Sequence, residues 1–294
     1  MKHRRLFAAF TAAALVLSLT GCSGDDEELS FGTEESSRAE TSGSQSGDGA
    51  EYDNSGRTFG DSATQLSMSG GDLQINRRTR SDNTAMGDSG WTIFVYLCGS
   101  DLESEGYAGT QDIIEAVSAQ YSEDVRIVYQ TGGANQWYED AGISNSNLQR
   151  WVTVDGDIEL VEELPDTSMG QADTLADFVS WGVENYPAKR MGLVLWNPGG
   201  GSISGVCLDA NHDYDSLSLN EIDSALNSVY DKMTDKFEFI GFDACLMSTM
   251  ETANILVPYA RYMFASEETE PGCGWNYTDI MNFLAENPDA DGNQ

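Results

Sequence analysis

Apolar and polar positions divide the chain into two unlike parts. Residues 23–89 are rich in Ser, Gly, Asp, Glu and Thr and contain few apolar positions. Such a segment cannot bury enough apolar surface to offset the entropy of ordering the chain, so we expect a disordered acidic linker over residues 22–89. From Trp91 onward, apolar runs alternate with amphipathic stretches. We therefore place one folded domain over residues 90–294.

The second part has the pattern of a parallel α/β protein. Continuous apolar, β-branched runs predict strands at 91–97, 125–129, 148–154, 158–164, 191–196, 237–242 and 261–265. Helical spacing predicts helices at 109–121, 173–186, about 247–256 and 278–286, and a capping box opens another at Ser218. Strands that alternate with helices form a mainly parallel sheet with helices on both faces. Right-handed crossovers then bring the loops after Trp196, Phe242 and Ala265 to one edge of that sheet.

The N-terminus has the pattern of a bacterial lipoprotein signal. Lys2, Arg4 and Arg5 precede an apolar stretch over 6–19 that is too short to span a membrane comfortably, and the stretch ends at Cys22. We expect a signal peptide over 1–21, cleavage before Cys22 and lipid on its thiol. That would hold the protein on the extracytoplasmic face of a bacterial membrane. The alternative is an ordinary secretory signal with a chance cysteine.

The balance of charge excludes one class of partner. The formal net charge of −34 repels nucleic acid and anionic lipid headgroups. One basic cluster, Arg77-Arg-Thr-Arg80, interrupts the acidic linker. It could be a processing site for an arginine-cutting protease, but a solvated cluster of linker charges is the interpretation we favour.

Neither the cysteines nor the histidines show the spacing of a metal site, so we expect no cofactor. An oxidising compartment permits a disulfide, and Cys207 and Cys273 both lie in predicted loops, but connectivity cannot be deduced from sequence. A polar loop supplies carboxylates that suit calcium, although their spacing fits no EF-hand and an acidic turn is the default. These are Asp209, Asp213 and Asp215.

Five blocks of sequence, in this order, resemble the clostripain family of cysteine peptidases, which belongs with the caspases, gingipains and legumains. The blocks are Tyr96-Leu-Cys-Gly-Ser-Asp-Leu-Glu103, Leu195-Trp-Asn-Pro-Gly-Gly-Gly201, Asp215-Ser-Leu-Ser-Leu219, Gly241-Phe-Asp-Ala-Cys-Leu-Met247 and Ala265-Ser-Glu-Glu-Thr-Glu-Pro271. The resemblance covers the chain from about Trp91 to its last residue. It implies a caspase-like α/β/α sandwich, endopeptidase activity, and cleavage after Arg or Lys in peptide or protein substrates.

The resemblance makes Cys245 the nucleophile. The residue follows a predicted buried strand, and a helix expected from about Met247 would favour the thiolate through its positive N-terminal end. The alternative is a small buried core residue, which a cysteine often is. The family pairs the acid at Asp243 with the basic side chain of the substrate, whereas its local alternative is a helix N-cap. Glu267 or Glu268 could add a second acid.

Pro198 is the departure from the family pattern, because the family has its catalytic histidine there. Proline has no titratable group, so it can neither take the thiol proton nor protonate the leaving amine. An unassisted thiol is only a few per cent ionised at neutral pH, and we therefore expect impaired turnover. Gly199 follows this position, and the resemblance gives its N–H, with that of Cys245, to the oxyanion hole; a flexible turn is the alternative.

Two further readings stay open. The chain could be a catalytically dead pseudopeptidase that binds basic peptides, or a truncated, non-functional fragment, since family members continue beyond residue 294. His212 is the other histidine after the signal, and it lies in a polar loop. We expect it to be solvated there and unable to replace the missing base.

Overall fold

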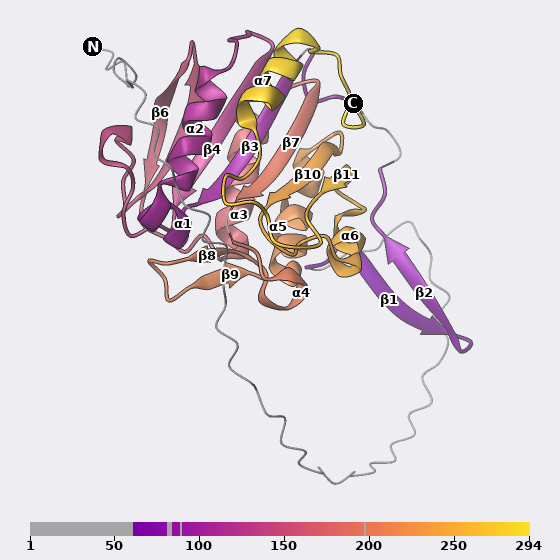
Figure 1. Ribbon diagram of the computed structural model, residues 1–294. Coiled ribbons are helices and arrows are strands. Elements are labelled where there is room, and N and C mark those ends of the chain that lie inside the picture. Colours follow the sequence, from indigo (N-terminus) through magenta and orange to yellow (C-terminus); the bar gives the residue numbers. More distant parts are fainter. Residues whose placement is uncertain (1–60, 81–83, 89, 197) are drawn as a thin grey trace.

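The computed structural model describes residues 61–80, 84–88, 90–196 and 198–294, so the predicted signal peptide and Cys22 lie outside the described residues. A seven-stranded sheet runs through the domain in the order β11-β10-β7-β3-β4-β5-β6 (Figure 1). Strands β11, β10, β7, β3 and β4 are parallel, and β5 and β6 extend the sheet as antiparallel strands. The strands are β3 (Trp91–Cys98), β4 (Val125–Gly132), β5 (Leu148–Val154), β6 (Asp157–Leu164), β7 (Arg190–Trp196), β10 (Phe237–Asp243) and β11 (Ala260–Phe264).

Helices cover both faces of this sheet, which confirms the predicted α/β/α layers (Figure 1). Helices α3 (Ala172–Asn185) and α5 (Leu219–Val229) pack on one face, where Phe178 and Ile222 are fully buried. Helices α2 (Ala108–Ser118) and α7 (Tyr277–Glu286) pack on the other, where Ile113 and Met281 are buried. Shorter helical segments complete the domain: α1 (Ser100–Gly106), α4 (Gly201–Ser204), α6 (Met250–Leu256), η1 (Glu139–Ala141) and η2 (Tyr230–Lys232).

Local sequence signals explain two of the element boundaries. Ser218 caps α5: its hydroxyl accepts the Glu221 N–H at 3.3 Å, and the Glu221 carboxylate accepts the Ser218 N–H at 2.9 Å. This is the predicted capping box. Between β5 and β6, Asp155 and Gly156 have φ values of 48° and 77°. Two consecutive left-handed residues make the tight hairpin turn that the Asp-Gly pair predicts.

The C-terminal half differs from the prediction in two places. Helix α6 begins at Met250 with Thr249 as its N-cap, three residues later than expected. A small hairpin of β8 (Val206–Asp209) and β9 (Asp215–Leu217) follows α4, where the sequence indicated only a polar loop. Both segments are short, so tertiary contacts rather than periodicity decide their structure.

The expected linker is partly folded, so the prediction of disorder up to residue 89 is wrong for its last third. Strands β1 (Thr64–Ser69) and β2 (Asp72–Arg77) form an antiparallel hairpin. The guanidinium groups of Arg78 and Arg80 lie 4.2 and 3.9 Å from the centre of the Tyr230 ring. The basic cluster is therefore docked on the domain and is not a solvated group of charges.

The sheet ends on one side at β11, beside β10 (Figure 1). Tyr262 and Phe264 of this edge strand are 38% and 44% exposed. Large aromatic side chains at a sheet edge are usually covered by another element.

Within the described ranges, none of the helices has the length and apolar character that crossing a membrane requires.

Candidate active site

Three loops meet at the carboxyl edge of the parallel sheet, as the crossover rule predicts. Strands β7 and β10 are neighbours, and their last paired residues are Trp196 and Asp243. The loop after β10 is joined to the loop after β11 by two backbone hydrogen bonds of 2.9 Å, from Leu246 N to the Glu268 carbonyl and from Ser248 N to the Ser266 carbonyl. The candidate residues after β7, β10 and β11 therefore share one site.

Gly199 lies directly against the backbone of Cys245. A Cβ atom at Gly199 would be 2.3 Å from the Cys245 carbonyl oxygen, so only glycine allows this approach. Pro198, at the position of the family histidine, is half-buried beside this contact. In the part of the chain that the structure describes, the N–H groups of Gly199 and Cys245 donate to no acceptor. The backbones of Gly199 and Cys245 therefore meet, and each residue has an N–H without an acceptor among the described residues.

The Cys245 thiol is half-buried, and its sulfur accepts the Glu270 N–H at 3.2 Å. It is not a core residue. The expected support from a helix N-terminus is wrong, because α6 starts five residues later and Thr249 is its cap. Instead, Leu246 adopts a left-handed conformation with φ of 64°, which turns the chain away immediately after the thiol. The sulfur therefore contacts the backbone N–H of Glu270, in the loop after β11, and not the N-terminus of a helix.

Asp243 ends β10 with its side chain buried. Its Oδ2 accepts hydrogen bonds from the Tyr277 hydroxyl at 3.0 Å and from the Trp275 N–H at 3.2 Å. Burial raises the pKa of this carboxyl to about 6, and the nearby acids Glu270 and Glu115 add to the effect. Since Thr249 caps the next helix, the N-cap alternative for Asp243 is excluded.

Asp112 is a second buried acid at this site, and it is not among the site residues predicted from the sequence. Its Oδ2 accepts the Trp196 indole N–H at 2.7 Å. Burial, followed by the proximity of Asp243, raises the pKa of Asp112 to about 8. A signal was available: Asp112 stands on the apolar face of a predicted helix, four residues before the buried Ala116.

Glu267 and Glu268 were expected to add a second carboxyl group beside Asp243, but neither side chain is buried with it. Both side chains are exposed. Glu268 contributes its backbone carbonyl to the loop junction with Leu246. The two acids therefore lie at the rim of the site.

His212 lies elsewhere along the same sheet edge. Ala210, two residues before His212, donates its N–H to the carbonyl of Gly133, just beyond the end of β4. Strand β4 is three positions from β10 in the sheet order, which is roughly 14 Å at the usual strand spacing. His212 is not simply solvated: its Nδ1 is 3.1 Å from Asp209 Oδ2 and its Nε2 is 3.7 Å from Asp166 Oδ2.

The acidic turn uses its carboxylates for its own structure. Asp209 is fully buried and accepts the N–H groups of Met169 at 2.8 Å and Asn211 at 2.9 Å. Asp215 accepts the Ser168 hydroxyl at 2.7 Å, and Asp213 is exposed. Across the described residues, no three or more His, Cys, Asp or Glu side chains are grouped so as to hold a metal ion.

The four cysteines among the described residues are free thiols, and the suggested pair of Cys207 and Cys273 does not form. Cys207 is fully buried and its thiol points to the Trp196 carbonyl at 3.9 Å. Cys273 is exposed in the loop that also carries Glu270. A bond between them would require the chain to rearrange.

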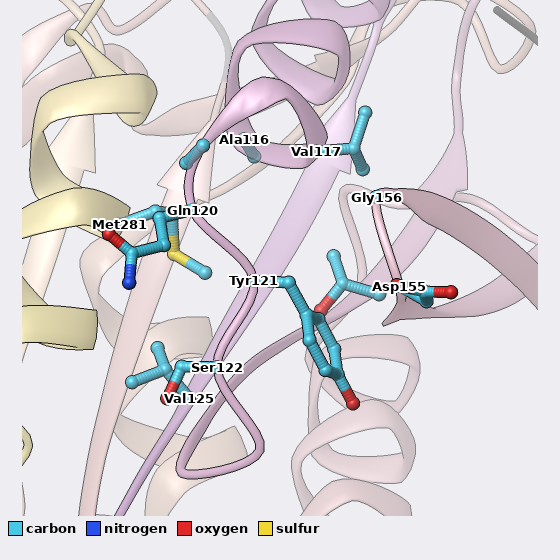
Figure 2. A pocket seen from close by; sticks show the side chains of 11 residues that line it. Ala116, Val117, Gln120, Tyr121, Ser122, Val125, Asp155, Gly156 and Met281 are labelled. Carbon is cyan, nitrogen blue, oxygen red and sulfur yellow. The ribbon is translucent and has the colours of Figure 1, made fainter.

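A small hollow lies at the opposite edge of the sheet from these residues. Figure 2 shows it between the end of α2, the first residue of β4, the hairpin turn at Asp155 and Gly156, and Met281 of α7. Because Val125 opens β4, this hollow is at the amino edge of the parallel strands. It is separate from the site around Cys245.

The layered sheet and the thiol at a strand end define a caspase-like α/β/α domain. The model of the clostripain family matches residues 95–294. The chain belongs to the clostripain family, which confirms the resemblance seen in the sequence blocks.

Individual relatives agree with this assignment. Clostripain from Hathewaya histolytica is 27% identical over 189 residues, which is 56% of this chain but only 34% of that protein's length. A secreted C11 cysteine protease from Bacteroides thetaiotaomicron, solved with an irreversible peptide inhibitor, is similar with a TM-score of 0.53 at 19% identity, covering 67% of this chain and 54% of that one. An inactive zymogen C11 protease from Parabacteroides distasonis is similar with a TM-score of 0.51 at 23% identity, covering 69% and 54%. At these identities the two structures support the fold.

Proposed function

We propose that this chain is a clostripain-like cysteine endopeptidase domain that binds peptides through an Arg or Lys side chain and forms a thioester at Cys245. The contact of Gly199 with the Cys245 backbone carries the proposal, because it brings together two residues whose N–H groups have no acceptor among the described residues and one of which bears a half-buried thiol. Donors placed where an oxyanion develops are the main catalytic feature of acyl-transfer sites.

The chemistry requires two proton transfers. The Cys245 sulfur forms a bond to the substrate carbonyl carbon, the C–N bond breaks, and the amine leaves with a proton. Water then hydrolyses the thioester, releasing the acid and restoring the thiol. A histidine at position 198 would move both protons. With Pro198 in place, nothing in the described turn replaces it, and we propose that peptide cleavage is severely impaired.

Selection of a basic residue rests on Asp243. The carboxylate is buried beside the thiol loop, and within the described residues it forms no ion pair with Lys, Arg or His. A buried carboxylate without a cation is costly, and an incoming guanidinium or ammonium would remove that cost. Glu267 and Glu268, exposed at the rim, would attract basic peptides over a longer range.

The sequence pattern at the N-terminus supports a proposal about where in the cell the protein acts. We propose that lipid on Cys22 anchors the protein to the extracytoplasmic face of a bacterial membrane, where peptide substrates reach the domain. The apolar stretch over 6–19 followed by Cys22 is the support for this proposal.

The proposal is tested with the purified full chain and two substrates. A peptidyl chloromethyl ketone ending in arginine labels Cys245 when the sulfur displaces chloride, a step that needs no protonated amine. An arginine-containing peptide reports cleavage. We expect labelling at Cys245 by mass spectrometry, negligible cleavage by the natural chain, and cleavage raised about 10²–10⁴-fold by Pro198→His.

The outcomes separate the alternatives. Cys245→Ala in the Pro198→His background must abolish both signals. Saturable binding of arginine peptides with neither labelling nor restored cleavage supports a binding module. Cleavage by the natural chain at the rate of the histidine variant contradicts the role given to position 198.

A further inference from the structure

Asp112 stands opposite Asp243 across the same buried space. Asp112 comes from α2, and its carboxylate is held by the indole N–H of Trp196, the residue paired with Asp243 in the sheet. The two acids are only 5% and 6% exposed. They therefore approach the site from different elements, one from a helix and one from a strand end.

Gly274 lies close to both acids, and its position limits how far apart their carboxylate oxygens can be. A Cβ atom at this glycine would be 3.1 Å from Asp112 Oδ2 and 3.1 Å from Asp243 Oδ2. The two oxygens are therefore separated by no more than twice that length. A planar guanidinium can donate to acceptors on two sides at this separation, whereas an ammonium is a compact point charge.

The surroundings of the two acids hold no compensating cation. Neither acid forms an ion pair with Lys, Arg or His in the described ranges, and the other charged groups that act on the pKa values of the two acids are all acids: Glu103, Glu115 and Glu270. Two buried carboxyl groups in such a place must stay protonated or await a cation. The negative charge of the two ionised carboxylates would therefore be neutralised only by a cationic ligand.

The loop over Gly274 covers this space. The Trp275 N–H donates to Asp243, and the Glu270 N–H donates to the Cys245 sulfur, both at 3.2 Å, while the Trp275 ring packs against the buried cluster on the α2 and α7 face. A substrate guanidinium that reached Asp243 would replace the first donor, and acylation of the sulfur would replace the second. Entry of a substrate side chain would require residues 270–275 to shift outward.

We propose that Asp112 is a second specificity-determining residue, which with Asp243 bridges the guanidinium of a substrate arginine and thereby favours arginine over lysine. This inference rests on the proposed function of the site. It assigns the second acid to α2 in place of the exposed Glu267 and Glu268.

The test compares how fast Cys245 is labelled by three peptidyl chloromethyl ketones that end in arginine, lysine or citrulline, the neutral shape-mimic of arginine. We expect the order arginine, lysine, citrulline for the natural chain. Asp112→Asn keeps an acceptor for Trp196 and should lower the arginine rate about tenfold to a hundredfold, the worth of one charge-assisted hydrogen bond. The citrulline rate should not change. Glu105→Gln, which neutralises an exposed acid on α1, is the matched control and should change no rate.

Each outcome has one meaning. An unchanged ratio of arginine to lysine in Asp112→Asn, with an unchanged citrulline rate, overturns the role of Asp112. A natural chain that does not prefer arginine to citrulline contradicts the proposed function itself.

A second measurement needs no variant and covers the case in which Asp112→Asn does not fold. The ratio of arginine to lysine labelling by the natural chain should rise from pH 6 to pH 9 as Asp112 loses its proton. The ratio cancels ionisation of the shared thiol. The other titratable groups around Asp112 and Asp243 are Glu103, Glu115, Glu270, Tyr129 and Tyr277. A flat ratio overturns the proposal.

Discussion

Pro198 and Cys245 follow neighbouring strands at equivalent positions: Pro198 comes two residues after Trp196 and Cys245 two residues after Asp243, the last residues that β7 and β10 pair. Parallel neighbours are about 4.8 Å apart, so equivalent positions lie next to each other at the carboxyl edge. A side chain at position 198 is therefore well placed to serve a thiol at position 245. The proposed mechanism needs a proton acceptor at position 198, and proline has no group that can accept one.

Gly199→Ala should damage the site through packing alone. The added methyl group would lie 2.3 Å from the Cys245 carbonyl oxygen and 2.9 Å from Met247. Such overpacking costs about 1–3 kcal/mol, and we expect both a lower urea midpoint and slower labelling of Cys245. Gly106→Ala is the control, because nothing lies within 4 Å of a Cβ there. Equal behaviour of the two variants would show that the turn and the thiol are not in contact.

The cysteines should differ strongly in their reaction with iodoacetamide. Cys273 is exposed and Cys245 half-buried, whereas Cys98 and Cys207 are fully buried and burial raises the pKa of both thiols. We expect the first two to be alkylated in the folded protein and the last two only in urea. Peptide mapping by mass spectrometry gives the order. Rapid alkylation of Cys98 in the native protein would contradict its buried position.

The sequence could predict the sheet because its strands are continuous apolar runs separated by amphipathic helices. It could also predict that the loops after β7, β10 and β11 converge, since right-handed crossovers leave no other arrangement. It marks Asp112 as an acid on the apolar face of a predicted helix, but it could not show that Asp112 is bonded to Trp196, which is far away in sequence, or that it lies near Asp243. Helix α6 began later than expected because Thr249, and not the end of the strand, supplies the cap.

The hairpin of β1 and β2 shows a second limit of predicting structure from amino-acid composition. Leu66 and Met68 alternate with polar residues before Gly70-Gly71, and Leu73 and Ile75 do so after it, which is a local hairpin signal that the overall composition of the linker obscured. The docking of the segment could not be predicted: Ala63 is fully buried, and Arg80 donates to the carbonyls of Tyr230 and Met233.

Arg80→Ala should loosen that docking. The change removes a cation–π contact with Tyr230 and two hydrogen bonds to carbonyls, which together contribute about 1–3 kcal/mol. We expect chymotrypsin to cut the hairpin faster at Leu66 or Leu73, both of which are exposed. Lys189→Ala removes a surface ion pair with Asp289 and serves as the control. Unaltered cleavage in Arg80→Ala would mean that the arginine does not hold the hairpin.

The buried acids should make the protein less stable as pH rises. In the folded state the pKa of Asp243 is about 6 and that of Asp112 about 8, both above the usual value of 3.8. Between these values and 3.8 the folded protein holds protons that the unfolded chain gives up, so the free energy of unfolding falls as pH rises through this range. Each group contributes a slope of at most about 1.4 kcal/mol per pH unit.

Asp112→Asn separates this effect from general charge repulsion in a chain of net charge −34. The asparagine keeps the bond to Trp196 and cannot ionise, so urea unfolding from pH 5 to 8.5 should show a flatter loss of stability between pH 6 and 8. Glu105→Gln removes one exposed charge and should leave the slope as it is. If both variants keep the natural slope, Asp112 ionises as it would in water, and the two acids do not share a closed space.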